Sequence, residues 1–534
     1  MDSTWSFVQL KFISGDGSMS VNRVVSSITE LVSVFRAAFA PYAGFGLLLV
    51  NLNEVPAEEQ FHVEVEERQL FLDDVGVQKI ENLKRTMHQP RKKGAVIRPN
   101  WHLGVSSVQV RTTPVWDPRQ KIFRFWDCAA TPPDLRAQGK SHTGYYESPD
   151  GLHWSQPDLG QVAYERWPNN NYISLLAGRR HVRTDYVVYD PTDPDPSRRY
   201  KCALPPIGFA ISPDGRRWQM LPDVSGVTSG DEANFSFDEK AHLFILTVKR
   251  SGPHGRSVHL ETSRDFKNWT NHGLIFYADD LDQQLGRETI RARFADPTLQ
   301  PLVANDPTRY NVDVYNMGVF RYESLYIGMP TMYHSTGPSL DGTNTDGFHH
   351  VQLACSRDLK NWNRLGNRRS FIDNSRPGGG SYDWTGMIGP SSAVQRGDEL
   401  WFYYTSAKYR RRPHQADPDT CAISLAVLRR DGFVSLDAGE TQGTILTKPF
   451  PLPDTKLLLN ADAPEGEIRV ELLDSDGTVV MRSRPLNGDL LHGQVHWQSG
   501  DIVDLSGQLV SLRFAVRQGH LYSYWFECRQ RQLQ

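Results

Sequence analysis

Four stretches of the sequence share one spacing and decide the fold: SPDGLHW at 148–154, SPDGRRW at 212–218, SRDFKNW at 263–269 and SRDLKNW at 356–362. Each places an aspartate two residues after a serine, and a tryptophan four residues after the aspartate. The first two contain Pro-Asp-Gly, which is typical of tight turns. The aspartate is suited to hydrogen bonds with the turn backbone, and the tryptophan is suited to cover an apolar layer between sheets. Four copies at one spacing indicate an internal repeat.

The segments before each copy agree as well, because each consists of a strand-like run, a turn and a second strand-like run. A fifth set follows, in which the motif is reduced to Arg430-Asp431-Gly432. A lone four-stranded sheet cannot bury both faces, so five such units are expected to stack around an axis. The expected strand pairs are 108–116 with 121–128, 186–189 with 200–204, 234–237 with 242–248, 314–322 with 325–333, and 388–395 with 400–405 and 423–428.

The remaining segments complete an all-β fold. The stretch Gln69–Ile80 (QLFLDDVGVQKI) is predicted to be the strand that closes the ring. After Pro453 apolar and polar residues alternate between Gly and Asp turns, a pattern typical of a β-sandwich. The sequence therefore predicts a five-bladed β-propeller followed by a C-terminal β-sandwich, with a short N-terminal helical extension. The expected domains are 1–60 for the extension, 61–453 for the catalytic propeller and 454–534 for the sandwich.

The N-terminal extension leaves two interpretations open. An apolar stretch runs from Leu31 to Leu52 and contains Arg36 and Pro41, which argue against a membrane span. As an amphipathic helix packed on the body, it predicts a cytoplasmic protein. As a signal-like segment, with Met19 as the true start, it predicts a periplasmic or secreted one.

Composition excludes several classes of function. The net charge of −3 and the dispersed basic residues do not resemble the basic surface of a nucleic-acid-binding protein. The five cysteines form no CxxC pair, so no zinc site is expected, and Cys128, Cys202, Cys355 and Cys421 are predicted to be buried thiols. The sequence contains no GxGxxG, Walker, Gly-x-Ser-x-Gly or HExxH motif. We therefore expect no redox cofactor; a structural Ca²⁺ is compatible with a propeller channel, and the oligomeric state is not indicated.

Acidic residues recur at or just before the first strand of each predicted blade. In a propeller these positions converge on a central funnel, and glycosidic cleavage needs two carboxyl groups, one as acid and one as base or nucleophile. The catalytic candidates are Asp74, Asp231, Asp313 and Asp383. Asp185 and Glu232 are held in reserve as substrate-binding residues. A purely structural interpretation is that these aspartates form turns, with Asp74 paired to Lys79.

Other polar and aromatic side chains in the same segments are candidates for binding sugar hydroxyls or stacking on a sugar face. Arg293 in RARFADP has two interpretations, a bidentate partner for a substrate carboxylate or a surface ion pair with Asp296. The candidate binding residues are His102, Arg183, Asn234, Arg293, Asn316, His334 and Trp384.

Together the repeat, the SRD(L/F)KNW stretches and the trailing sandwich resemble glycoside hydrolase families 32 and 43, the superfamily of invertases, levanases and arabinanases. LFLDD at 70–74, GDEANFSFD at 230–238 and GDELWFYYT at 397–405 are similar to bacterial family 32-like proteins. The resemblance implies a propeller that carries two aspartates and a glutamate as its catalytic acids. The invertase motifs Trp-Met-Asn-Asp-Pro-Asn-Gly, Arg-Asp-Pro and Glu-Cys are absent, so the resemblance does not imply fructan cleavage.

We expect a hydrolase of O-glycosidic bonds that acts on furanosides or on plant and algal oligosaccharides. One alternative is a sialidase-like enzyme, because Ser-x-Asp-x-x-x-Trp is similar to an Asp box; such an enzyme also needs three arginines around a carboxylate and a nucleophilic tyrosine. A second alternative is a non-catalytic propeller that binds carbohydrate.

Overall fold

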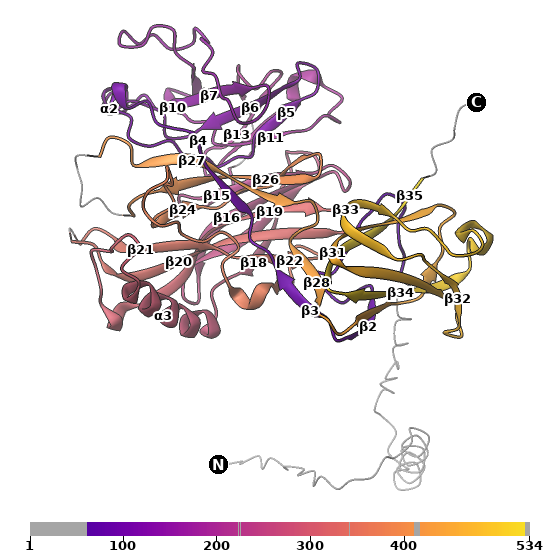
Figure 1. Cartoon of the computed structure of the whole chain (residues 1–534). Helices are drawn as coiled ribbons and strands as arrows, with labels where there is room; N and C mark the ends of the chain where they lie inside the picture. Colours follow the sequence, from indigo (N-terminus) through magenta and orange to yellow (C-terminus); the bar gives the residue numbers. More distant parts are fainter. Residues whose placement is uncertain (1–60, 223, 225, 341, 411–416, 529–534) are drawn as a thin grey trace, which may run out of the picture. The chain divides into compact units, whose positions relative to one another are not determined.

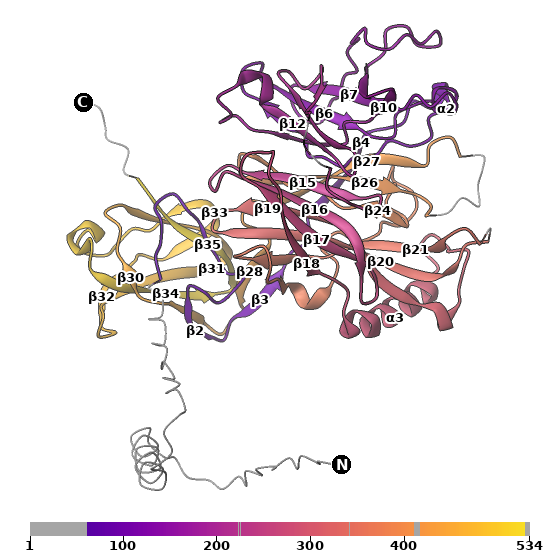
Figure 2. The ribbon, with the colours of Figure 1, turned by 180° about the vertical axis from the view of Figure 1, so that it is seen from behind.

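The computed structural model describes residues 61–222, 224, 226–340, 342–410 and 417–528. All of them belong to one compact unit, Gln60–Gln534, and the predicted N-terminal helical extension lies outside the described residues. Within the described part the chain is almost entirely β-structure, with two α-helices, α2 (Pro133–Ala137) and α3 (Asp280–Ala295) (Figures 1 and 2). Neither helix has the length and apolar character needed to span a membrane.

Five antiparallel sheets form the predicted blades (Figure 1). Blade 1 contains β5 (Val115–Asp117), β6 (Ile122–Asp127), β7 (Thr143–Ser148) and β8 (Tyr172–Ile173). Blade 2 contains β11 (Tyr186–Tyr189), β12 (Tyr200–Leu204), β13 (Gly208–Ser212) and β14 (Gln219–Met220). Blade 3 contains β15 (Ala233–Asp238), β16 (Leu243–Gly252), β17 (Gly255–Ser263) and β18 (Thr270–Phe276).

The last two blades carry additional strands. Blade 4 contains β19 (Asn311–Tyr322), β20 (Leu325–Pro338), β22 (Ala354–Ser356) and β23 (Asn363–Arg364), and β21 (Thr345–Val351) also pairs with β20. Blade 5 contains β24 (Gly386–Ile388), β26 (Glu399–Ala407), β27 (Cys421–Arg429) and β4 (Arg91–Ile97), and β25 (Val394–Arg396) also pairs with β26. A separate hairpin of β9 (Leu175–Ala177) and β10 (Arg180–Val182) joins blades 1 and 2.

Apolar clusters between successive blades show that the five sheets form a closed ring. Trp126 of blade 1 packs with Cys202 of blade 2, and each following pair of blades shares a cluster in the same way. The ring closes where Tyr403 of blade 5 packs with Phe125 of blade 1. These buried interfaces supply the hydrophobic stabilisation that no single blade could provide.

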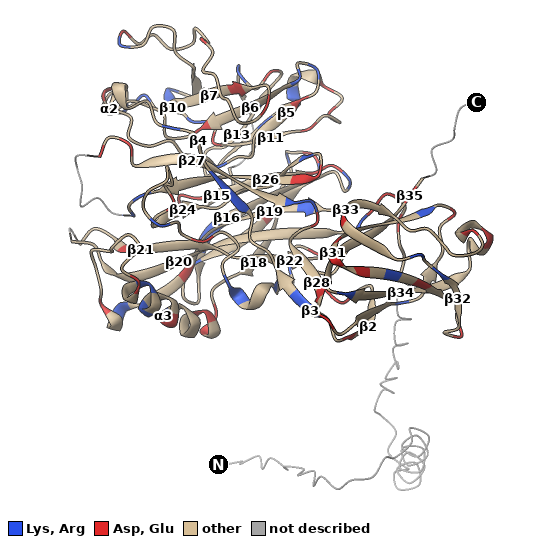
Figure 3. Ribbon diagram, viewed as in Figure 1, with Lys and Arg blue, Asp and Glu red and all other residues tan. Residues whose placement is uncertain are grey.

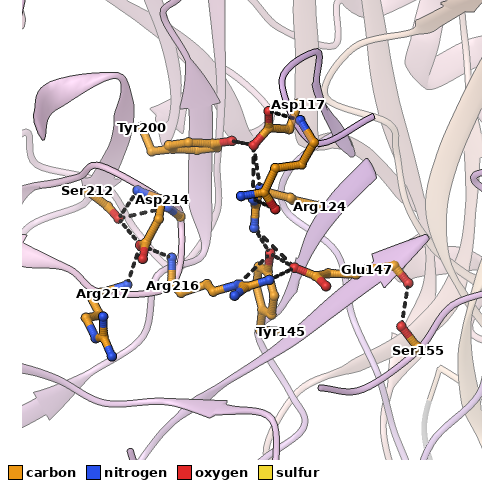
Figure 4. Close-up of polar contacts among 12 residues, drawn as sticks. Asp117, Arg124, Tyr145, Glu147, Ser155, Tyr200, Ser212, Asp214, Arg216 and Arg217 are labelled. Atoms are coloured by element: carbon orange, nitrogen blue, oxygen red, sulfur yellow. Dashed lines mark hydrogen bonds and ion pairs between the residues drawn. The ribbon is translucent and has the colours of Figure 1, made fainter. Parts of the chain in front are cut away.

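The repeated motif is a turn that secures each blade. In the second copy, Asp214 Oδ1 accepts hydrogen bonds from the backbone N–H groups of Arg216 and Arg217, at 2.9 and 2.8 Å (Figure 4). Trp218 Nε1 donates to the Gly215 carbonyl at 3.0 Å, and its ring packs against the cluster between blades 1 and 2. Gly215 has a φ of 71°, in the left-handed region where glycine carries no steric penalty. The aspartates of the other copies, Asp150, Asp265 and Asp358, make the same paired backbone contacts.

The same turn reaches the neighbouring blade through an arginine. Arg216 forms an ion pair with Glu147 of blade 1 (Figure 4). Glu147 also accepts from Arg124, a 1 % exposed guanidinium that donates to Asp117 at 2.9 Å. This partly buried network of charges fixes blade 1 against blade 2 by hydrogen bonds in addition to the apolar contacts.

The predicted closing strand was wrong. Gln69–Ile80 does not join blade 5; instead β4 pairs with β27, and its Ile97 lies opposite Ile423. The first half of β4 is basic and partly exposed (blue in Figure 3), as an outer blade edge allows. The more apolar Gln69–Ile80 instead holds β1 (Gln69–Leu70), a bent segment and the start of β2 (Val77–Glu81), and both strands belong to another sheet.

That other sheet has eleven strands. It contains strands from both sides of Pro453, so it does not begin at the predicted domain boundary there. Strands from the beginning of the chain pair with strands from its end, so residues before and after the propeller share one apolar core that includes Phe71 and Phe514. Its strands are β1 (Gln69–Leu70), β2 (Val77–Glu81), β3 (Lys84–Met87), β28 (Val434–Ala438), β29 (Gly443–Thr447), β30 (Phe450–Pro451), β31 (Lys456–Leu473), β32 (Val479–Arg482), β33 (Leu486–Gln494), β34 (Leu509–Arg517) and β35 (Gly519–Glu527).

The reduced fifth motif lies between the propeller and this sheet. Asp431 is fully buried and accepts from Arg68, Tyr322 and Ser523 at 2.6 Å each. Phe433 is buried in the cluster between blades 4 and 5, where the other copies provide a tryptophan for their own interfaces. The chain still turns here, with the Gly432 N–H donating to the Arg429 carbonyl at 2.9 Å, but Asp431 bonds the junction instead of the turn backbone, which explains why the sequence departs from the other four copies.

The prediction about the cysteines is confirmed. Cys128, Cys202, Cys355 and Cys421 are buried and free, and Cys528 is exposed.

Candidate functional site

The predicted acids of blades 2, 3 and 4 lie at the same end of the propeller, because each sits at or just before the first strand of its blade. Asp185 precedes β11, Asp231 and Glu232 precede β15, and Asp313 is the third residue of β19. We call this end the mouth. Two cavities open there, and both are lined by Gln109.

The first cavity, of about 630 Å³, brings two of the predicted acids together. We call it the Asp185 cavity; its polar lining includes Gln109, Arg111, Arg180, Arg183, Asp185 and Asp231. Asp185 is buried and its Oδ2 lies 2.9 Å from Arg183, whereas its Oδ1 has no hydrogen-bond partner among the described residues. Asp231 has an exposed carboxylate that is paired with Lys249.

The environments of these two carboxyls shift their pKa values in opposite directions. Burial raises the pKa of Asp185, and the charge of Arg183 only partly opposes this effect. Burial acts in the same sense on Asp231, but the hydrogen bond and charge of Lys249 outweigh it and lower the pKa. Acid–base catalysis by two carboxyls uses groups whose environments push their pKa values apart, as they do here.

Asp127, which sequence reasoning missed, adds a third carboxyl to this region. It is fully buried at the end of β6, and burial raises its pKa to about 7, to which the nearby charge of Asp185 contributes. Its Oδ1 accepts the backbone N–H groups of Gln109 and Ala129 at 2.8 Å, and its Oδ2 has no partner among the described residues. Its sequence neighbours, WDC, look like ordinary strand core and offer no signal.

Glu232 does not line the cavity, and both of its carboxylate oxygens accept hydrogen bonds. Arg111 donates to both of its carboxylate oxygens, to Oε1 at 2.7 Å, and both side chains are buried. Asp231 and Glu232 therefore lie in different environments, as neighbours that alternate in direction do. Arg111 was also missed, although VQVR at 108–111 alternates apolar and polar residues and so places Gln109 and Arg111 on one strand face.

Blade 4 contributes Asp313 and Tyr315, and cations from blades 3 and 5 gather around the Tyr315 ring. Asp313 Oδ2 accepts from Arg256 Nε at 2.8 Å; burial raises the pKa of this carboxyl, and Arg256 opposes the rise. Lys249, Arg256 and Arg410 lie 4.4, 5.0 and 5.7 Å from the centroid of Tyr315.

Two of the four predicted catalytic acids lie away from this group. Asp383 is buried before β24, where it pairs with Lys92 at 2.7 Å and accepts from Tyr404 at 3.0 Å, and it lines neither cavity. Asp74 is in the eleven-stranded sheet between β1 and β2, exposed and paired with Arg85 rather than Lys79. Its placement at the mouth depended on Gln69–Ile80 closing the ring, and that premise was wrong.

The predicted binding residues are divided between the channel and the periphery. Asn234 donates to Ser391 at 2.8 Å and accepts from Asn316 at 3.0 Å, so these two amides fill the channel below the mouth. Arg183 is at the mouth. Arg293, on α3, donates to Asn374 and to two backbone carbonyls instead of pairing with Asp296.

The other three lie elsewhere. His102 is exposed in a short 3-10 turn and stacks on Trp101. His334 is buried, stacks on Phe348 and lines a cavity beside α3. Trp384 donates to Ser381 at 3.0 Å. None of the three lines either mouth cavity.

No cluster of three or more His, Cys, Asp or Glu side chains in the described part of the chain is arranged to hold a metal ion. The compatibility of the channel with a structural Ca²⁺ therefore stays a prediction.

Comparisons with known proteins identify glycoside hydrolases among the similar solved structures. A family 32 β-fructofuranosidase from Bombyx mori has 10% sequence identity and a TM-score of 0.36, covering 82% of this chain and 94% of its own. A family 43 arabinoxylan arabinofuranohydrolase from Bacillus subtilis has 9% identity and a TM-score of 0.36, covering 82% and 99%. Fructan 1-exohydrolase IIa from Cichorium intybus has 10% identity and a TM-score of 0.35, covering 83% and 98%.

Neither family models nor curated proteins gave a match. At such low identities and scores, the fold assignment rests on the strand pairing, and the function has to be argued from the mouth.

Proposed function

We propose that the protein hydrolyses O-glycosidic bonds at the propeller mouth, with Asp185 as general acid and Asp231 as general base or nucleophile. One observation carries the proposal: both carboxyls line a single cavity, and their pKa values are shifted in opposite directions. Glycoside hydrolysis needs this pair, one carboxyl to protonate the leaving oxygen and one to activate water or attack the anomeric carbon.

The cavity has the size and polarity expected of a sugar site. A volume of about 630 Å³ falls within the range of small-molecule pockets. The unpartnered Oδ1 of Asp185 is an acceptor, and sugar hydroxyls are donors. Gln109, Arg180 and Arg183 add donors along the same wall. The preference for furanosides or for plant and algal oligosaccharides remains part of the proposal.

The remaining candidates take supporting roles in this proposal. Glu232 holds Arg111 in the lining of the Asp185 cavity, and Asp313 orients Arg256 beside Tyr315. Asp383 supports blade 5 through Lys92 and Tyr404.

The test is hydrolysis of a panel of aryl glycosides and plant and algal polysaccharides, measured as released phenol or reducing sugar. Asp185→Asn and Asp231→Asn are each expected to lower kcat by at least about 100-fold on whichever substrate is cleaved. Asp476→Asn, an exposed carboxyl in a turn of the eleven-stranded sheet, is the matched control and should keep full activity. Full turnover by both mouth variants would refute the assignment, and the anomer first released would show whether Asp231 is nucleophile or base.

A second candidate function is a carbohydrate-binding propeller without catalysis. The observation that favours it is that Asp185, Asp231, Glu232 and Asp313 each pair with a cation. A wild-type protein that binds an oligosaccharide and cleaves no member of the panel would support this alternative.

A further inference from the structure

The second cavity at the mouth differs from the first in its charge. It has a volume of about 330 Å³, and we call it the Arg410 cavity; its polar lining includes Gln109, Arg136, Tyr315, His349, Thr405 and Arg410. Among the described residues, its lining contains two arginines and no aspartate or glutamate. The Asp185 cavity, which shares Gln109 with it, holds the acids.

These two arginines stand out by their lack of acidic partners in the described part of the chain. Within the described ranges, no aspartate or glutamate forms an ion pair with Arg136 or Arg410, whereas Arg111, Arg183 and Arg256 each have one. Arg136 projects from α2 and is exposed. Arg410 is partly buried, and its Nε is buried without a hydrogen-bond partner among the described residues.

Aromatic rings hold Arg410 in place. Its guanidinium carbon lies 5.7 Å from the Tyr315 centroid and 5.2 Å from the Tyr333 centroid, within the range of cation–π attraction. Arg256 lies over the same two rings, at 5.0 and 4.6 Å.

The charges around Tyr315 do not balance. Of its three cations, Lys249 pairs with Asp231 and Arg256 pairs with Asp313, which leaves Arg410 as the surplus charge. His349 does not offset or add to this charge, because burial and the neighbouring guanidinium groups hold its pKa well below the usual value and keep it neutral. Like charges this close repel each other in a partly dry site, and an anion would remove the repulsion.

We propose that the Arg410 cavity is a subsite for an anionic group on the sugar, a carboxylate or a sulfate ester, recognised by Arg136 and Arg410. Arginine suits this role because its planar donors match the oxygens of such groups in a bidentate manner. This inference rests on the proposed function only in making the ligand a saccharide; it adds that the saccharide is acidic. The shared Gln109 places the anionic group next to the bond at the Asp185 cavity.

The experiment is a binding measurement on an array of acidic oligosaccharides. The arms are oligomers of galacturonate, glucuronate, mannuronate and guluronate, and sulfated galactans, each beside its carboxyl-reduced or desulfated neutral counterpart. Asp231→Asn protein is used so that the bound sugar is not turned over. Acidic members are expected to be retained over their neutral counterparts, with affinity falling as NaCl is raised. The arm that is retained identifies carboxylate or sulfate as the anionic group.

Variants then assign the binding to this cavity. Arg410→Gln and Arg136→Gln, each made in the Asp231→Asn protein, are expected to weaken acidic binding by about 10- to 100-fold, the range for one charge-assisted contact. Arg217→Gln is the matched control, because Arg217 is an exposed arginine in the blade 2 turn. The two test positions differ in burial, so a folding defect at Arg410 would not be shared by Arg136.

Opposite outcomes overturn the inference. Equal retention of acidic and neutral counterparts, no retention of any acidic member, or an equal loss in Arg217→Gln would each show that this is not an anionic subsite. Hydrolysis of a neutral oligosaccharide without acidic preference would remove the subsite and leave the proposed glycosidase standing. Retention of an acidic member by a wild type that cleaves no saccharide would support the anionic subsite and remove the proposed glycosidase activity.

Discussion

Replacing Asp127 by asparagine is expected to stabilise the protein at neutral and alkaline pH. This carboxyl is fully buried; one oxygen accepts two backbone N–H groups and the other has no partner among the described residues. Burial raises its pKa to about 7. Asparagine keeps the accepting oxygen, carries no charge and places an amide at the second position, so it resembles the protonated aspartic acid.

The sign and size of the effect follow from proton linkage. A free aspartic acid ionises with a pKa of about 3.9. Between that pH and about 7 the folded chain therefore holds a proton at Asp127 that the unfolded chain has released. The free energy of unfolding falls as the pH rises through this window and stays reduced above it. A pKa difference of about 3 corresponds to about 4 kcal/mol, which is an upper bound for the loss.

The assay is urea unfolding followed by tryptophan fluorescence, at pH 4 and pH 8, for the wild type and Asp127→Asn. We expect similar stabilities at pH 4 and an advantage of about 2–4 kcal/mol for the variant at pH 8. Asp476→Asn, an exposed carboxyl, should show no such pH-dependent advantage. A variant that is less stable than the wild type at pH 8, or a difference that does not change with pH, would refute the reasoning.

Three further predictions concern the frame of the site. Arg111→Met and Glu232→Met should each cost about 3–5 kcal/mol in urea unfolding, because one buried charge is left alone, whereas the double variant should recover most of the loss; additive costs would mean that the pair is not coupled. Asp214→Ala should lower stability by about 1–2 kcal/mol through lost turn hydrogen bonds, and Arg217→Ala, which keeps its backbone N–H, should cost less than about 0.5 kcal/mol in the same assay. An aromatic disulfide reagent should titrate one thiol, Cys528, in the folded protein and all five in urea; rapid reaction of more than one would contradict the buried positions.

The fold could be predicted because its determinants are local and repeated. Asp214 and Trp218 act within one seven-residue turn, so their spacing alone reports the structure. The strands Tyr186–Tyr189 and Tyr200–Leu204 were also predicted with the bounds that the structure has. The closing strand could not be predicted in this way, because its identity depends on which of two segments pairs with β27. Ile97 and its basic neighbours look less like a strand than Leu70 and Leu72 do.

The candidate site was predicted in part, for a related physical reason. Asp185 and Asp231 were found because a propeller brings the starts of its first strands together, which depends on fold alone. Asp127 lies at the end of β6, and its raised pKa depends on burial and on the charge of Asp185, which is distant along the chain. The partners that set the pKa values, Arg183 and Lys249, come from other positions along the chain, and no spacing in the sequence connects Lys249 to Asp231.

The number of hydrogen-bonded oxygens on each carboxylate at the mouth distinguishes a catalytic role from a structural one. A structural carboxylate in a protein interior normally has both oxygens satisfied, as Glu232 does with Arg111. Asp185 and Asp313 instead each give one oxygen to an arginine, while the other oxygen is buried and has no partner among the described residues. A buried acceptor of this kind destabilises the folded state unless a donor reaches it. The cations therefore orient these carboxyls without saturating them, which is how a hydroxyl-bearing substrate could complete the site.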